Sequence, residues 1–243
     1  MADPFHTTRW SVVLAAGRDS QTDASARALE TLCQTYWFPL YAFVRHRVRD
    51  EHEAQDLTQA FFERLFEKRT LADADPDRGR FRAFLLTACK RFLANEWHKE
   101  NAQKRGGGLR VLSLDFEAAA KRYSVEPTNT LTAEVLFEQQ WAIALIDSVL
   151  AQLRQAYADR GCEEQFDRLK AFLSGKKTSS YAAIAETMET TEGATKVAVH
   201  RLRTRYREMM RSEIAQTVDS PDEIEDEIRR LFEVLSRKRD NSL

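Results

Sequence analysis

The chain has 243 residues, of which 43% are hydrophobic, and it contains only 8 glycines and 5 prolines. This length allows one or two domains with their own cores, and few helix breakers favour an all-α protein. The net charge of −1 excludes a uniformly basic or acidic chain, yet it sums strong opposite patches: residues 50–77 are acidic, whereas 78–110 and 196–211 are basic. Such patches suggest more than one macromolecular contact.

Three cysteines are scattered along the chain, without a CxxC pair or a histidine at ligand spacing. This usage is typical of a reducing cytoplasm and speaks against disulfides and a structural zinc. No apolar run approaches the length of a membrane span, and the first residues lack a signal-peptide pattern. The sequence therefore predicts a cytoplasmic protein with no membrane span, metal site or cofactor.

The first half reads as a short lead, residues 1–21, followed by helices. Helical patterning starts near residue 22, and Pro39 is expected to kink or break it. A second helix is predicted over 56–68 from an apolar stripe. After a turn-forming segment, a third helix is predicted over 81–99.

The helix predicted over 81–99 belongs to a segment, 80–105, in which aromatic residues alternate with lysines and arginines. Aromatic rings can stack on unpaired bases while cations follow the phosphates, as single-strand binding requires. The alternative is an amphipathic core helix with a basic polar side. Phe81, Phe84 and Phe92 fit that core, and Trp97 is the better candidate for a DNA contact.

Residues 106–132 contain three consecutive glycines and weak periodicity, which predicts a linker. Residues 133–173 return to helical patterning. The tail, 212–243, contains an apolar stripe typical of one more helix, which we expect to pack on the second domain rather than to be a free interaction motif. The stripe is formed by Ile224, Ile228, Leu231 and Leu235.

Residues 179–206 have the pattern of a helix-turn-helix. A first helix is predicted over 181–188, Thr191 is a plausible N-cap, and the second helix places Thr195, Val199, Leu202 and Tyr206 on one face. Residues 196–211 hold six basic residues and one acidic residue, a density that fits phosphate neutralisation in a major groove. The alternative is a solvated helical hairpin, common in all-α proteins.

In their order along the chain, these features resemble a bacterial extracytoplasmic-function (group 4) sigma factor, in a subgroup with a C-terminal extension. The resemblance spans about 22–105 and 133–211. The segments that carry it are DLTQAFF (56–62), FRAFLL (81–86), YAAIA (181–185), EGATKV (192–197) and RLR (201–203). It implies a region-2-like domain over 22–105, a region-4-like domain over 133–211 and an extension over 212–243.

The resemblance also implies roles for individual residues. Asp56, Gln59 and Phe62 would contact core RNA polymerase. The −10 element would be contacted by Phe81, Arg82, Arg91, Asn95 and Trp97. The −35 element would be contacted by Lys196, Val197, His200 and Arg201 at base edges, and by Arg203 and Arg205 at phosphates.

Two carboxylates typical of the family's polymerase-gripping helix are replaced here by Gln55 and Ala60. A phosphate on Thr58, between them, would restore negative charge. Thr58 is therefore a candidate phosphorylation site controlling polymerase binding. The alternative is a β-branched core threonine.

The partners implied are core RNA polymerase, promoter DNA, and an anti-sigma factor or a serine/threonine kinase. The sequence contains no nucleophile–base pair or phosphate-cradling loop that would indicate an enzyme. It also lacks the Glu-x-x-His pattern that a helical metal-dependent hydrolase would need. Two alternatives stay open: a helix-turn-helix regulator that acts without core polymerase, and a sigma-like adaptor that binds polymerase without melting DNA.

Overall fold

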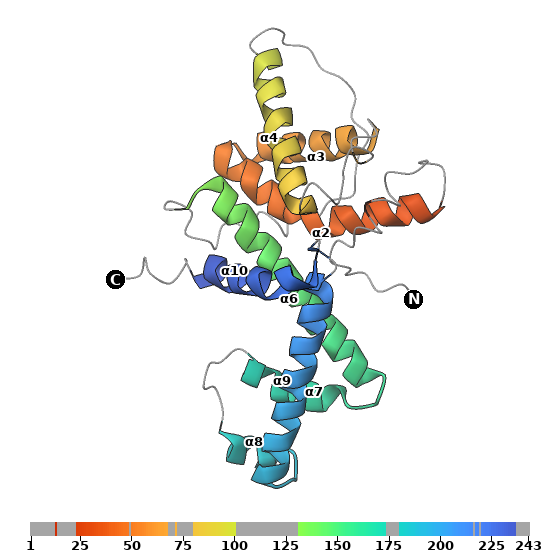
Figure 1. Ribbon diagram of the computed structural model, residues 1–243, viewed down its shortest axis with the longest axis vertical. Coiled ribbons are helices and arrows are strands. Elements are labelled where there is room, and N and C mark those ends of the chain that lie inside the picture. Colours follow the sequence, from red (N-terminus) through yellow and green to blue (C-terminus); the bar gives the residue numbers. More distant parts are fainter. Residues whose placement is uncertain are drawn as a thin grey trace. The chain divides into compact units, whose positions relative to one another are not determined.

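The structure is a computed structural model that describes residues 13, 23–48, 50–67, 71, 80–100, 131–173, 180–215, 217–218 and 220–236. Within these residues every regular element is a helix (Figure 1), which confirms the all-α prediction. The chain divides into two compact units, one of residues 1–144 with 215–243, the other of residues 145–214. The expected lead and linker lie outside the described residues, except for positions 13, 131 and 132.

The first unit is built from long helices around an aromatic core. Phe81 meets Tyr36 edge to ring at 5.6 Å between centroids, and Phe61 meets Phe92 at 5.7 Å. Buried aromatic pairs of this kind add stabilisation beyond the area that they bury. The unit contains α2 (Asp23–Arg47), α3 (Glu51–Glu67), α4 (Phe81–Glu100), the start of α6 (Ala133–Ala158), η4 (Pro221–Glu223) and α10 (Ile224–Ser236).

Pro39 lies inside α2 and does not end it. Of the two expected outcomes, a kink or a break, the structure shows no break, and Figure 1 shows the helix changing direction along its length. Packing explains the continuity, because the residues around Pro39, among them Leu40 and Tyr41, are fully buried. Helix α3 begins five residues before the predicted start, where Asp50 accepts a hydrogen bond from Glu53 N at 2.8 Å.

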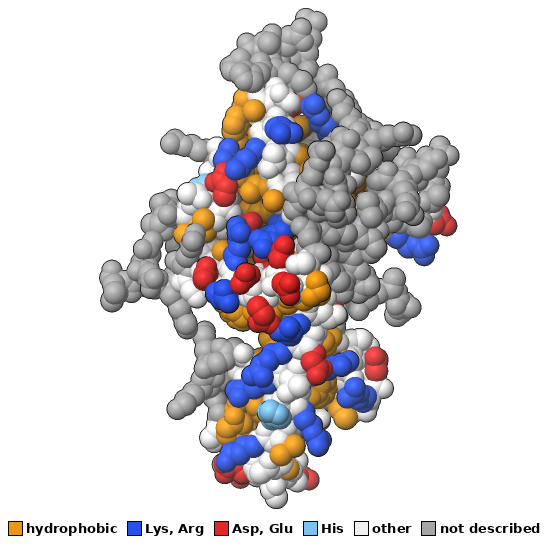
Figure 2. Space-filling model, viewed as in Figure 1, with side chains coloured by type: hydrophobic (Ala, Val, Ile, Leu, Met, Phe, Trp, Pro, Cys, Tyr) orange, Lys and Arg blue, Asp and Glu red, His pale blue; other side chains and the backbone are white. Residues whose placement is uncertain are grey.

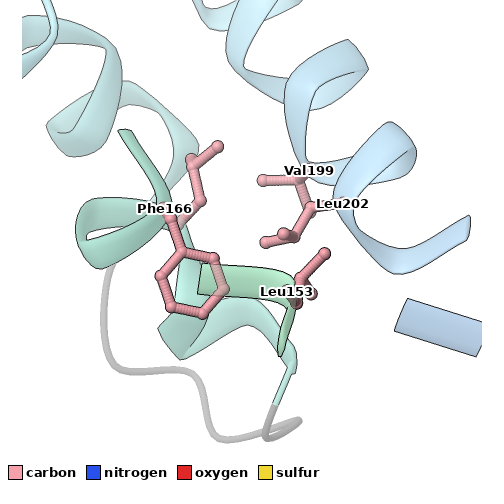
Figure 3. Packing of buried hydrophobic residues seen from close by; sticks show 5 residues of the cluster. Leu153, Phe166, Val199 and Leu202 are labelled. Atoms are coloured by element: carbon pink, nitrogen blue, oxygen red, sulfur yellow. The ribbon is translucent and has the colours of Figure 1, made fainter. Parts of the chain in front are cut away.

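The second unit contains the remainder of α6, α7 (Glu163–Leu169), η3 (Lys170–Leu173), α8 (Tyr181–Thr187) and α9 (Glu192–Ala215). Its core joins α6, α7 and α9 through Leu153, Phe166 and Leu202, whose side chains point toward one another (Figure 3). Each such side chain contributes about 1.5–3 kcal/mol by leaving water. This core holds α9 against α6 and α7 and so fixes the position of the helices that follow α7.

The C-terminal helix α10 belongs to the first unit. Its Leu231 and Val234 are buried, and the Val234 carbonyl accepts a hydrogen bond from Gln139 Nε2 of α6 at 2.9 Å. Glu227 of α10 contacts Arg82 of α4. The expected packing on residues 133–211 is therefore met in part, through Gln139 of α6, while the Arg82–Glu227 charge pair also ties α10 to α4, which the sequence did not predict.

Candidate nucleic-acid interface

Helices α8 and α9 are joined by a short turn, an arrangement compatible with the predicted helix-turn-helix, and both helices start with a side-chain cap. Ser180 Oγ accepts a hydrogen bond from Ala183 N, and Thr191 Oγ1 accepts one from Ala194 N, both at 3.1 Å. The N-cap prediction for Thr191 is thus confirmed. The turn between them is tight: Glu189 has a φ of 51° and Thr190 N donates to Ala185 O at 3.0 Å.

One face of α9 is buried and the other is exposed and basic. Thr195, Val199 and Leu202 are buried, as the spacing predicts. Figure 2 shows lysine and arginine side chains gathered over this part of the second unit. The exposed side chains on α9 include Lys196, Val197, His200, Arg201 and Arg205.

Two exposed ion pairs on α9 use residues of the predicted −35 face. Lys196 Nζ lies 2.7 Å from Glu192 Oε1, and Arg205 Nη1 lies 3.6 Å from Glu208 Oε2. The hydrogen bond to Glu192 raises the pKa of Lys196, which keeps the ammonium charged. Exposed pairs of this kind are weak, so a DNA phosphate can replace the carboxylate at little cost.

Val197 gives the same face an apolar spot, since half of its side-chain surface is exposed. It lies between Lys196 and the next turn, where His200 and Arg201 are also exposed. Apolar side chains in a major groove contact the thymine methyl group, while arginine binds guanine. The face therefore offers both kinds of base-reading chemistry.

Arg203 differs from the other predicted −35 residues because it is half-buried and its guanidinium is already hydrogen-bonded within the protein. Its Nε and Nη2 donate to the Phe172 carbonyl at 3.2 and 3.0 Å. Arg168 of α7 likewise donates to the Thr187 carbonyl at the end of α8. These two arginines tie α8 and α9 to the preceding helices, and the bonds to Phe172 argue against the phosphate contact expected of Arg203.

The predicted −10 residues separate into two groups on α4. Arg91, Asn95 and Trp97 are exposed, with Trp97 at 37%. Phe81 and Arg82 are buried. The exposed group alone presents a cation, an amide and an aromatic ring to a partner.

Arg82 lies in an ionic cluster that the sequence did not predict. Its Nε donates to Glu138 Oε2 at 3.0 Å, it pairs with Glu227, and its guanidinium lies 4.2 Å from the Trp141 ring centroid. Arg80 Nη2 lies 2.8 Å from the other oxygen of Glu227. We call Arg80, Arg82, Glu138 and Glu227 the arginine cluster.

The predicted polymerase-binding residues on α3 are also separated. Asp56 is exposed, Gln59 is half-buried and donates to Glu63 Oε1 at 3.2 Å, and Phe62 is buried in the core. Thr58 is fully buried, and its hydroxyl donates to Ala54 O at 2.7 Å. This burial favours a core threonine, and phosphorylation of Thr58 stays a prediction that requires α3 to open.

Within the part of the chain that the structure describes, no group of three or more histidine, cysteine or acidic side chains is arranged to hold a metal ion. Burial raises the pKa of the Cys33 and Cys89 thiols to about 12, so neither is a thiolate at neutral pH. No helix among the described residues is both long and apolar enough to cross a bilayer.

The residues missed by sequence reasoning are those that join distant segments. Glu227, Glu138 and Arg168 carry no local pattern that separates them from solvated surface charges. The only available signal was charge complementarity, since the tail begins with acidic residues and the segment around Arg82 is basic.

Comparison with known proteins gives one finding. Residues 34–103, less than a third of the chain, match the family described as Sigma-70 region 2. No curated protein and no solved structure matches the chain. The matched residues include α3, α4 and most of α2, so they contain the expected polymerase-binding and −10 segments. This match supports a sigma-70 family sigma factor that takes part in transcription initiation.

Proposed function

We propose that the chain is a group 4, extracytoplasmic-function-type sigma factor with a C-terminal extension. Residues 22–105 bind core RNA polymerase and the opened −10 element, and residues 133–211 bind the −35 element. The observation that carries this proposal is the Sigma-70 region 2 match over residues 34–103, followed in the same chain by a helix-turn-helix with an exposed basic helix.

The −35 half of the proposal rests on α9. Lys196, Val197, His200 and Arg201 occur at i, i+1, i+4 and i+5, and all four are exposed. This spacing suits a recognition helix whose first turns enter the major groove. Arg205, one turn farther along, is placed for a phosphate.

The −10 half rests on the exposed end of α4. A base pulled out of the duplex costs a few kcal/mol in stacking and pairing, which a stacking partner must offset. Trp97 is an exposed ring, and Arg91 and Asn95 lie on the same helix within two turns. Trp97 stacks on an unpaired base while Arg91 meets the backbone.

Such a protein works where RNA polymerase works, in the cytoplasm, and has no enzymatic activity of its own. Its regulator is an anti-sigma factor or a serine/threonine kinase. The second candidate function, a helix-turn-helix regulator that acts without polymerase, is supported by α8 and α9 alone. The region 2 match favours the sigma factor over it, and over an adaptor that binds polymerase without melting DNA.

The test combines co-purification with core RNA polymerase and transcription from a library of random promoters. A sigma factor makes core polymerase initiate at a defined set of sequences and opens them. A separate regulator instead binds duplex DNA specifically by itself and leaves core polymerase inactive on the library. An adaptor co-purifies with polymerase and opens no promoter.

A further inference from the structure

The arginine cluster places two cations of a proposed DNA-binding helix against a single carboxylate from the other end of the chain. Arg80 immediately precedes α4 and Arg82 is its second residue. Both contact Glu227 of α10, whose side chain is 1% exposed. We propose that Arg80 and Arg82 form a phosphate-binding pair for promoter DNA, and that α10 covers the pair as an autoinhibitory helix.

The hydrogen bonding within the arginine cluster is incomplete, which favours a contact between Glu227 and the two arginines that can break. Arg82 Nη1 and Glu227 Oε2 each lack a well-directed hydrogen bond, and Arg80 approaches Glu227 Oε2 as an ion pair only. Buried charges with unsatisfied atoms lose much of the Coulomb energy to desolvation, and apolar side chains of similar volume often stabilise a docked helix at least as well. A carboxylate is nevertheless the group that competes directly with a phosphate for arginine.

Helix α10 is attached weakly enough to leave. Among the residues that the structure describes, α10 buries Glu227, Leu231 and Val234, and it is held by the ion pairs of Glu227 and one hydrogen bond from Gln139. Its exposed face is mostly charged, with Phe232 as the exposed large apolar side chain. A groove of about 610 Å³, lined by α4, α6 and α10 residues such as Leu86, Glu138 and Arg230, lies beside it.

Release of α10 changes the charge presented at the start of α4. Glu138 remains paired with Arg82 Nε, while Arg80 and the far side of Arg82 lose their carboxylate. Because α10 is tethered to the same chain, it competes with DNA at a high effective concentration. The apparent DNA affinity is then the intrinsic affinity multiplied by the fraction of molecules in which α10 is released. This inference rests on the proposed function for its promoter context, but the competition itself concerns any nucleic-acid phosphate.

The test measures binding of a fluorescent single-stranded DNA of random sequence to the full-length free chain across a salt series. Glu227→Gln removes the competing charge with little change in shape. Leu231→Glu is a second route, because it undocks α10 and leaves Glu227 intact. Glu233→Gln, an exposed carboxylate on the same helix, is the control for a change in net charge.

We expect Glu227→Gln and Leu231→Glu to bind about threefold more tightly or better, and the control to bind like wild type. The slope of log affinity against log salt should steepen by about 0.7 for each arginine that gains a phosphate. Wild-type affinity and slope in both variants would overturn the proposal. If Glu227→Gln unfolds, as judged by circular dichroism, Leu231→Glu alone decides.

Failure of the proposed function is detected separately, by absence of binding to core polymerase. A chain that fails that assay but gains DNA affinity in both variants still has the autoinhibitory helix. A chain that drives transcription yet shows no gain has α10 as a permanent part of the first unit.

Discussion

The ring of Phe172 stacks on the ring of Tyr181, with centroids 4.8 Å apart and planes 5° from parallel. This contact joins the end of η3 to the first residue of α8. Lys196 Nζ lies on the Tyr181 ring as well, 5.8 Å from its centroid. Arg203 holds the Phe172 carbonyl, so both helices of the helix-turn-helix depend on one residue of η3.

Removal of the Tyr181 ring should therefore destabilise the helix-turn-helix. We expect Tyr181→Ala to lower the free energy of unfolding by about 2 kcal/mol, since stacking adds about 0.5–1.5 kcal/mol to the area that the ring buries. Tyr181→Phe keeps the stack and should stay within about 0.5 kcal/mol of wild type. Denaturant unfolding of the full chain gives both values. Equal losses in the two variants would show that the hydroxyl, not the stack, matters.

Arg201 and Arg205 should affect DNA binding in different ways. Arg201→Ala should cost about 1–3 kcal/mol and relax the preference at one or two −35 bases, because arginine reads guanine bidentately. Arg205→Ala should weaken all sequences alike and lower the salt slope by about one. Selection from a randomised −35 library by the holoenzyme measures the base preference, and a salt titration of holoenzyme binding measures the slope. Equal changes of base preference in the two variants would contradict this assignment of the α9 face.

Arg203→Ala is the matched comparison for these two variants. Since the guanidinium donates twice to Phe172 O, its loss should lower the stability of the helix-turn-helix by about 1–3 kcal/mol. The salt slope measured at a temperature where the variant is folded should equal that of wild type. A slope reduced by about one would instead place Arg203 on a phosphate.

Trp97 should be required for opening of the promoter and not for polymerase binding. Its exposed ring can stack on an unpaired base, whereas the proposed polymerase-binding segment is on α3. In a Trp97→Ala holoenzyme, permanganate footprinting should detect less unpaired thymine at the −10 element, with co-purification of core polymerase unchanged. Trp97→Phe should retain most of the melting. Unchanged melting by the alanine variant would remove Trp97 from the DNA site.

Glu134 should make the first unit sensitive to acid. A hydrogen bond from Lys90, helped by Arg47, lowers the pKa of Glu134 from 4.5 to about 2. A carboxyl whose pKa is lowered in the folded chain contributes stability above pH 4.5, and this contribution is lost as the pH falls toward 2. Glu134→Gln should flatten this part of the stability curve, by no more than about 1 kcal/mol because the three side chains are partly exposed. Denaturant midpoints between pH 6 and 2.5 test this, with Glu208→Gln as the control; parallel curves for Glu134→Gln and wild type would contradict the assignment.

The Thr58 hypothesis is decided by core-polymerase affinity in the absence of any kinase. If a phosphate supplies missing charge on α3, Thr58→Glu and the double variant Gln55→Glu/Ala60→Glu should both bind more tightly than wild type and Thr58→Val. Because Thr58 is buried and bonded to Ala54 O, we expect Thr58→Glu to lower stability as well, so folding is measured beside affinity. Wild-type binding as tight as that of the double variant would exclude the switch.

Periodicity predicted those features that depend on one helix at a time. The inward residues Val199 and Leu202 and the cap at Thr191 follow from spacing and local hydrogen-bonding chemistry. Arg82 could not be placed in this way, since its burial results from carboxylates 56 and 145 positions farther along the chain. Pro39 shows the same limit, because tertiary packing holds α2 together where local propensity favours an end.

Trp141 lies buried beneath the Arg82 guanidinium, whereas Trp97 is exposed on α4. The fluorescence of these two indoles therefore reports on two different events, release of α10 at Trp141 and base stacking at Trp97, without any added label. Departure of α10 removes a neighbouring carboxylate and admits water near Trp141, which shifts its emission to longer wavelength. Stacking of a base on Trp97 quenches a separate, already solvent-exposed emitter. In a variant that keeps Trp141 as its only tryptophan, with Trp10, Trp37 and Trp97 replaced by phenylalanine, intrinsic fluorescence follows movement of the C-terminal helix during assembly on a promoter.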